Sequence, residues 1–319
     1  MAGVLALVFA LSLLVGRYPG PLLLSPERLA GDNLAQQLVF NLRLPRLLTA
    51  VMLGMSLSAA GMVLQMILGN PLVEPGFLGV SQGAAFGAAL SIIFLGSAAW
   101  LVQGAAILFA GLGLVLSYTL ARRARMGGWV LRLVLAGIAV SALFSAGVGV
   151  LKYIADPLRQ LPEITFWLLG GLWSITWTQA RSIAPVVLIS LYVMYRMRWR
   201  LNLLSLDDAT AFSLGVSPGR ERALVLTAAV AATAAVVSVA GMVGWIGLIV
   251  PHIARRLFGA DARHALPAAM LMGGLLAVLC DDAARTLLAG EIPVGILTSL
   301  VGALLFIAMM MTRNIRVER

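Results

Sequence analysis

The 319-residue sequence is poor in the residues that catalysis, metal binding and a water-exposed surface require. Charged residues make up 11% of it, against about a quarter in soluble domains, so it lacks the polar surface to cover itself in water. Its one cysteine, Cys280, excludes an internal disulfide, and together with two histidines it cannot supply a His/Cys metal site of ordinary ligand count. The single lysine, Lys152, precedes Tyr153, which excludes a G-x-x-x-x-G-K-S/T phosphate loop.

Apolar residues are abundant: they make up 61% of the chain, and its mean hydropathy is +0.99. The apolar runs are continuous rather than alternating, which favours helices over the strands of a membrane barrel. Since a spanning helix needs roughly 20 apolar residues, the sequence predicts an all-α polytopic membrane protein with about ten spans, in one transmembrane domain over residues 1–319. The expected spans, of which the first, sixth and eighth are short, are 1–16, 47–68, 77–95, 98–120, 129–152, 182–195, 223–240, 246–258, 265–285 and 293–312.

The net charge of +10 is interpreted as a topology signal and not as a nucleic-acid footprint, because no basic patch interleaves with aromatic residues on a soluble region. With the N-terminus inside, fifteen of the 23 Lys and Arg residues fall in cytoplasmic segments and eight fall outside. Both termini are therefore expected in the cytoplasm. The N-terminal apolar run has no basic n-region or small-residue cleavage site, so it is interpreted as the first span and not as a signal peptide.

Three segments between the spans are long enough to have structure of their own. Residues 17–46 and 153–181 lie on the outer side, and the second of these is rich in aromatic residues suited to the water–lipid interface. Residues 201–222 lie on the inner side, where apolar and polar residues alternate too closely for a span. They predict a short cytoplasmic helix–turn–helix, ended by Gly215, Pro218 and Gly219.

A polar interruption, GNPLVEPGFLGVSQGA at 69–84, separates two apolar runs. Four glycines and two prolines allow a sharp turn into a short third span, and Asn70 and Ser81 can satisfy backbone groups freed by the prolines. AGMV at 60–63 recurs at 240–243, with glycine and proline matches at the same spacing of 180 residues. This favours an inverted-topology repeat, although chance matches are common in apolar sequence and that alternative stays open.

Asp281, Asp282 and Arg285 interrupt the ninth span near its outer end. The arginine follows the two acids at helical spacing, which favours a local ion pair or a docking contact over a proton relay. A proton-coupled carrier needs acidic or histidine groups deeper in the bundle, and the sequence indicates none.

Five blocks in this order resemble the permease subunits of binding-protein-dependent ABC importers of the FecCD type, which move iron chelates, haem and vitamin B12. The resemblance covers nearly the whole chain. The blocks are RLPR (43–46), GMSLSAAGMVLQMILGNPLVEPGFLGVSQGA (54–84), LSLDDATAFSLGV (204–216), GMVGWIGLIVPHIARRLFG (241–259) and DDAARTLLAGEIPVGILTSLVGA (281–303).

The resemblance implies a ten-helix subunit of the type II importer fold that forms a homodimer in the bacterial inner membrane. Two cytoplasmic ATPases, which carry ATP and Mg, and one periplasmic binding protein would complete the machine. No cofactor is implied for this chain itself. The implied cargo is an iron chelate, either siderophore or haem, with cobalamin or a molybdate-like oxyanion as the alternative. A standalone secondary transporter and a membrane scaffold without transport are the competing readings from other classes.

The resemblance also implies roles for individual residues. Exposed outer arginines would dock the binding protein, against the alternatives of lipid-phosphate anchoring or pairing within the chain; these are Arg43, Arg46 and Arg285. The 204–216 block would seat in a groove of the ATPase, through Leu206, Asp207, Asp208, Phe212, Leu214 and Gly215.

Small residues at helical spacing on the fifth and tenth helices would line the translocation path, or else permit tight helix packing. They are Gly137, Ser141, Ser145, Gly149, Gly295 and Ser299. Residues of the two broken blocks would act as hinge and packing positions, or as a gate, namely Asn70, Pro71, Pro75, Gly79, Gly241 and Pro251. The chain departs from the family pattern at 241–245, GMVGW instead of G-P-I-G-F, and at 302–306, GALLF instead of G-A-P-F-F.

Overall fold

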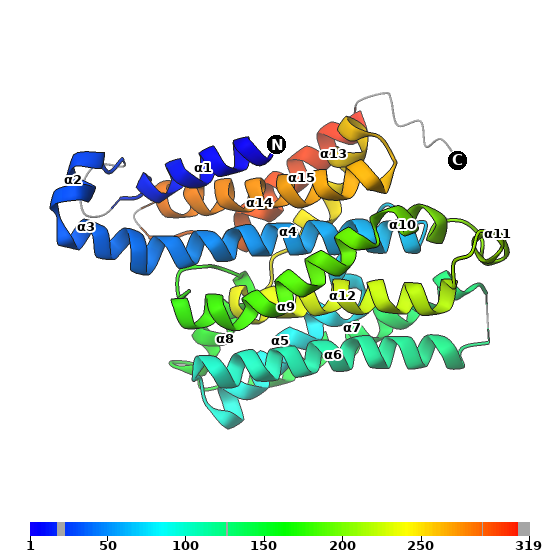
Figure 1. Ribbon diagram of the computed structural model, residues 1–319. Helices are drawn as coiled ribbons and strands as arrows, with labels where there is room; N and C mark the ends of the chain where they lie inside the picture. The colour runs from blue at the N-terminus through cyan, green and yellow to red at the C-terminus, as the bar shows by residue number, and fades with distance from the viewer. Residues whose placement is uncertain (18–22, 126, 289, 312–319) are drawn as a thin grey trace.

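The computed structural model describes residues 1–17, 23–125, 127–288 and 290–311, and within them the chain is a bundle of α-helices (Figure 1). Two π-helical segments, η1 and η3, and one 3₁₀ turn, η2, interrupt or extend these helices. The elements are α1 (Ala2–Leu14), α2 (Pro26–Gly31), α3 (Asn33–Gln37), η1 (Leu38–Arg43), α4 (Leu44–Ile67), η2 (Pro75–Leu78), α5 (Val80–Leu90), η3 (Ser91–Leu95), α6 (Ala99–Arg123), α7 (Trp129–Ile154), α8 (Gln160–Leu169), α9 (Trp177–Arg196), α10 (Arg198–Leu204), α11 (Asp208–Ser213), α12 (Pro218–Ala240), α13 (Ile246–Phe258), α14 (Ala262–Thr286) and α15 (Val294–Met311).

Within the described residues, every apolar run predicted as a span is mostly helical. Among the described residues, six helical stretches are long and apolar enough to cross a membrane, and α9 with α10 forms a seventh that is bent by 61°. Two further apolar helices, α1 and the α5–η3 stretch, are shorter, and α13 is 13 residues long. The prediction of an all-α polytopic membrane protein with about ten helices is confirmed.

The second span begins well before its predicted start at residue 47. A continuous helix of 35 residues runs from Asn33 to Ile67, and the Asp32 side chain caps it by accepting a hydrogen bond from the Leu34 amide. Pro45 does not break this helix because it lies in the first turn of α4, directly after π-helical η1. The RLPR block is therefore helical and does not form part of an outer loop.

The sixth span is longer than the predicted 182–195. Thr176 and Gln179 form a capping box that starts α9 at Trp177, and the helix continues to Arg196. The prediction from apolar residues missed this first turn because the turn contains polar residues.

Helix α4 runs through the centre of the molecule (Figure 1). It packs against α13 and α14 on one side and against α9 and α12 on the other, while α5, α6 and α7 form a second group beyond α12. The short helices α10 and α11 lie at one end of the bundle, and α2 and α8 lie at the opposite end (Figure 1).

Glycines allow α4 to approach its neighbours backbone to backbone. A Cβ atom at Gly54 would lie 2.0 Å from the Gly273 carbonyl oxygen of α14, and one at Gly61 would lie 1.9 Å from the Gly247 carbonyl oxygen of α13. Small residues at helix contacts are the usual basis of such packing in membranes, where burial of apolar surface does not drive association.

The letters repeated at a spacing of 180 residues do not occupy equivalent positions. Gly61 lies inside α4, whereas Gly241 ends α12 with a φ of 69°. Gly79 precedes a helix and Gly259 follows one. An alignment of the two halves at this spacing of 180 residues therefore pairs helix-interior positions with helix ends, and helix starts with helix ends.

We predict that Gly61→Ala destabilises the purified protein by about 1–3 kcal/mol, because the added methyl group must push α4 and α13 apart. Thermal unfolding in detergent, followed by scanning fluorimetry, measures the effect. The matched control is Gly104→Ala in α6, where a Cβ atom meets nothing within 4 Å and where alanine has the better helix propensity. Equal melting temperatures for the two variants would contradict the close approach.

Candidate functional site

The segment predicted to contact an ATPase is a compact helix–turn–helix at one end of the bundle. Helices α10 and α11 are joined by a short turn, and Gly215 follows α11 with a φ of 81°, in the left-handed region that favours glycine. The segment packs inward through Ala211 and Val216, which are buried, whereas the phenyl ring of Phe212 is 72% exposed. Pro218 and Gly219 begin α12 and do not end the segment, which corrects that part of the prediction.

Polar contacts fix this segment to the neighbouring helices. Arg222 of α12 donates to the Asp208 carboxylate at 2.5 Å and to the Leu204 carbonyl at 2.9 Å. Asn202 of α10 donates to the Asp261 carboxylate at 2.7 Å and accepts from the Ala262 amide at the start of α14. Sequence reasoning missed Asn202 and Arg222, since nothing in the spacing indicates which helix each one contacts.

The six residues predicted for coupling divide into two groups. Leu206, Phe212 and Leu214 are exposed apolar side chains, which we call the apolar triad. Asp207 is the N-cap of α11 and accepts from the Thr210 amide at 3.0 Å, so its carboxylate has a structural task. Hydrogen bonds from the side chain and backbone of Thr210 lower the pKa of Asp207, which keeps this cap ionised.

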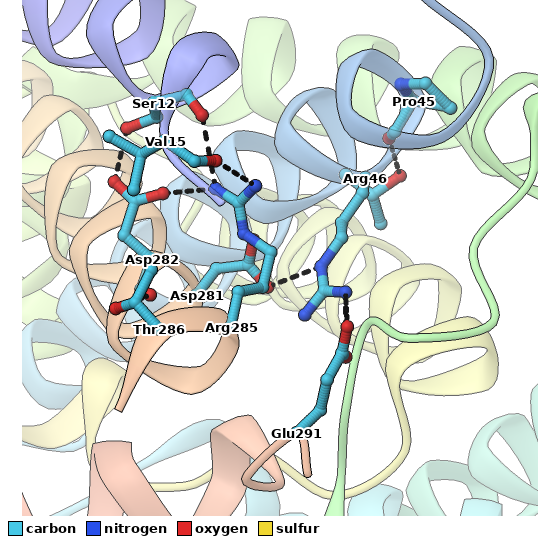
Figure 2. A network of polar contacts seen from close by, with 10 residues as sticks. Ser12, Val15, Pro45, Arg46, Asp281, Asp282, Arg285, Thr286 and Glu291 are labelled. Atoms are coloured by element: carbon cyan, nitrogen blue, oxygen red, sulfur yellow. Dashed lines mark hydrogen bonds and ion pairs between the residues drawn. The ribbon is translucent and has the colours of Figure 1, made fainter. Parts of the chain in front are cut away.

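An ion-pair network closes the other end of the bundle, between α1, α4 and α14 (Figure 2). Arg46 donates to Asp281 at 2.8 Å and to Glu291 at 2.8 Å. Arg285 pairs with Asp281 at 3.2 Å and with Asp282, and it also donates to the Val15 carbonyl at the end of α1. The ion pair predicted within the ninth span is therefore present, and it extends to α4.

The expectation that Arg43, Arg46 and Arg285 are exposed is wrong. Their exposed fractions are 8%, 7% and 9%. The reason is that the RLPR block is helical and packs on α14, so that the guanidinium groups face carboxylates and carbonyls of their own chain. Glu291, whose side chain is 42% exposed, is a partner that the sequence did not reveal.

The first broken block turns as predicted. The Asn70 side chain accepts from the Leu72 amide at 2.9 Å, Pro75 begins η2, and Gly79 has a φ of 78° at the start of α5. Pro71 lies exposed in the turn. Ser81 lines a neighbouring cavity.

The second broken block lies directly against the first. Pro251 is buried within α13, and Gly241 approaches the Trp167 carbonyl so closely that a Cβ atom would lie 2.1 Å from it. Gln65 of α4 joins the two blocks, donating to the Val73 carbonyl at 3.2 Å and to the Gly247 carbonyl at 3.3 Å. Arg255 donates a hydrogen bond to the side-chain oxygen of Gln65, Oε1, at 2.6 Å.

A cavity of about 300 Å³ lies between the two broken blocks. Its wall includes Glu74, Gln82 and Ser141, and the Glu74 carboxylate accepts from the Trp245 amide at 3.3 Å. Trp245 has a φ of 70°, and its ring lies 6.2 Å from that of Phe306 on α15. The expectation that no acidic group lies deeper in the bundle is wrong, because Glu74 is half-buried here.

The small residues predicted to line a path separate into two kinds. Gly137 and Gly295 are packing positions, since a Cβ atom at either would lie 2.3 Å from a carbonyl oxygen, of Phe77 and Leu169 respectively. Four others have partly or fully open surroundings: Ser141 and Ser299 are half-buried, and Ser145 and Gly149 are exposed on one face of α7. Within the described ranges, no group of three or more His, Cys, Asp or Glu side chains is placed to hold a metal ion.

We predict that Arg46→Ala destabilises the protein by about 3–5 kcal/mol, because it leaves Asp281 buried with one partner fewer. The measurement is thermal unfolding of the purified protein in detergent. Arg263→Ala is the matched control, since its side chain is 57% exposed and lies 3.9 Å from Asp261, an arrangement worth little. A loss for Arg46→Ala no larger than for this control would contradict the network.

The comparisons with known proteins cover nearly the whole chain. The FecCD transport family matches residues 4–312. The molybdate import system permease protein MolB of Haemophilus influenzae is 39% identical over 276 residues, which cover 86% of this chain and 81% of that protein. A probable iron chelatin transport system permease protein of Helicobacter pylori is 39% identical over 271 residues, which cover 85% and 81%.

A solved structure has the same fold. It is described as an inward-facing conformation of an ABC transporter of the metal-chelate type, and it superposes with a TM-score of 0.89 at 39% identity, covering 97% of this chain and 96% of that one. The family match, the relatives and the shared fold agree with one another. The chain therefore belongs to the FecCD transport family, as a permease of the ABC importer type.

Proposed function

We propose that this chain is the membrane subunit of an importer that moves an iron chelate, a siderophore or haem, across the bacterial inner membrane. Two copies would surround the path, with two cytoplasmic ATPases supplying ATP hydrolysis with Mg and a periplasmic protein delivering the cargo. Both termini and the α10–α11 segment would lie in the cytoplasm. Of the residues behind that orientation, Arg313, Arg316 and Arg319 lie outside the described residues.

The apolar triad carries this proposal. Leu206, Phe212 and Leu214 are exposed on a segment that polar contacts fix to α12 and α14, so a force applied there reaches two long helices. Exposed apolar side chains on a polar end of the bundle are typical of a protein interface. A carrier working alone has no need of such a surface.

In a dimer, the small residues on the surface of α7 and α15 would line a path between the two copies of the chain. Ser145 and Gly149 lie on the open face of α7, and Ser299 is half-buried on α15. If these faces are turned toward the partner copy, the path runs between the subunits and has small, weakly polar walls. Such walls suit cargo that is selected elsewhere, on the binding protein.

The cargo is proposed to be a metal chelate rather than a small oxyanion. This rests on the relatives, several of which are named as permeases for iron chelates or haem. Molybdate is the second candidate because one relative is named as a molybdate permease, and cobalamin is the third.

Docking of the binding protein through Arg43, Arg46 and Arg285 stays a prediction, with a new requirement. Because these guanidinium groups are engaged within the chain, a partner's carboxylates would have to replace Asp281, Asp282 or Glu291 at Arg46 and Arg285, and the Leu13 carbonyl at Arg43. Glu291 is the accessible member of the network and lies where such an exchange would begin.

We predict that Phe212→Asp abolishes at least nine-tenths of ATPase association, because it places a charge in the apolar contact. Co-purification of the ATPase with tagged permease from the native membrane is the measurement. Phe94→Asp is the control, since Phe94 is a similarly exposed ring near the opposite end of the bundle. Unchanged recovery of the ATPase with Phe212→Asp would overturn the coupling role.

We also predict that, in proteoliposomes holding permease and ATPase, a binding protein loaded with a ferric chelate stimulates ATP hydrolysis several-fold, whereas molybdate does not. The comparison uses one panel of ferric siderophore, haem, cobalamin and molybdate, each with its binding protein. The permease without ATPase should accumulate none of them. If only the molybdate-loaded binding protein stimulates ATP hydrolysis, the cargo is molybdate and not a ferric chelate. Uphill transport by the permease without ATPase would contradict the proposed ATP-driven mechanism.

A further inference from the structure

A large cavity at the end of the bundle away from α10–α11 has no role in the proposed transport cycle. Its volume is about 710 Å³, within the range of small-molecule sites. The wall is built by the first turns of α6 and α9, by α8, by the α8–α9 loop and by the last residues of α12. It is thus lined by one copy of the chain and opens to the surface, where Trp100 and Phe166 are exposed.

The wall combines aromatic faces with one carboxylate. Three tryptophans and one phenylalanine line the cavity, namely Trp100, Phe166, Trp167 and Trp173, and the rings of Phe166 and Trp173 meet edge to face at 6.2 Å. Glu163 is the one charged residue among the lining side chains. Aromatic faces beside a carboxylate are the surroundings in which proteins hold organic ammonium groups.

The position of the carboxylate fits a cationic ligand. Partial burial raises the pKa of Glu163, and contacts with Ser97 and Arg159 act in the opposite direction. Glu163 is an exposed residue, so a cationic group can reach its carboxylate from the surface.

On the two helices whose first turns line the cavity, exposed apolar side chains follow one to two turns further along. Ile107 and Leu108 lie about two turns below Trp100 on α6, and Val186 and Ile189 lie one to two turns below Ser182 on α9. All four side chains are exposed, so they form the part of the surface that faces acyl chains in a bilayer. An aromatic cavity with one carboxylate, above an apolar surface, suits a lipid with a charged headgroup.

The start of α6 supplies a place for a phosphate group. Ala98 is its N-cap, and an alanine side chain cannot accept the free amide hydrogens of the first turn. The positive end of this 25-residue helix faces the same cavity as Glu163, and the Gln103 side chain beside it donates to the Ser182 hydroxyl at 2.9 Å. A ligand with one anionic and one cationic group would satisfy both ends.

We propose that this cavity binds the headgroup of a zwitterionic phospholipid, with its ammonium group against Glu163 and the tryptophans and its phosphate at the start of α6. An aromatic belt at the membrane interface explains exposed tryptophans, but it requires neither a cavity nor a carboxylate among them. The proposal is independent of cargo and of ATPase, and it can be tested on the permease by itself.

The test is lipid retention. The full chain is reconstituted in vesicles of equal parts phosphatidylethanolamine and phosphatidylglycerol, extracted in mild detergent, and its bound lipid is identified by native mass spectrometry. We expect the wild-type protein to retain the ammonium lipid about 5- to 10-fold over phosphatidylglycerol, and Glu163→Gln to bring this ratio close to one. Trp173→Ala should lower the ratio in the same direction.

Two controls and one competitor make the outcome decisive. Glu27→Gln removes an exposed carboxylate of α2, and Tyr153→Ala removes a ring that is 90% exposed outside the cavity, so both should keep the wild-type ratio. The site is refuted by a wild-type ratio near one, by a Glu163→Gln protein with an unchanged ratio, or by equal losses in the controls. Displacement of the lipid by dilute soluble phosphocholine would refute a lipid occupant, since a soluble ligand would then fill the cavity.

Discussion

The approach of α4 to α13 and α14 is the constraint on which the rest of the fold depends. In a bilayer, apolar surface gains nothing by leaving lipid, so helices are held together by close packing and by polar contacts. Here glycines allow main chain to touch main chain at Gly54 and Gly61, while Arg46 with Asp281 and Gln65 with Arg255 close the two ends of the same seam. The broken blocks and the outer network are positioned by this one contact.

Much of the fold could be predicted because lipid imposes a simple rule on sequence. Continuous apolar runs located every span, and turn residues located the break at 69–79 and the α10–α11 segment. Helix ends were predicted less well, because polar first turns such as the one at Thr176 carry no apolar signal. The start at Asn33 was missed for the same reason, because the first turn at 33–37 is mostly polar.

The candidate sites depend on pairings that a single sequence does not contain. Arg46 could be recognised as an outer arginine, but its carboxylates lie 235 and 245 residues further along the chain, and only helix packing brings them together. The small residues of α7 and α15 show the same limit. Gly137 and Gly149 belong to one fourfold pattern, but twelve residues turn the helix by about 120° between them. A Cβ atom at Gly137 would meet a carbonyl oxygen, whereas one at Gly149 would meet nothing within 4 Å.

Trp245, which belongs to the first departure from the family pattern, packs against two residues of the second, Gly302 and Phe306. Among the described residues it is the one non-glycine with a positive φ, and its side chain lies where a Cβ atom at Gly302 would clash, beside the ring of Phe306. Positions that stand 57 or more residues apart in the chain are thus neighbours, and each constrains what the other can become. A side chain at 302 would compete with Trp245 for the same space, so enlarging Gly302 requires that Trp245 move or be replaced by a smaller residue.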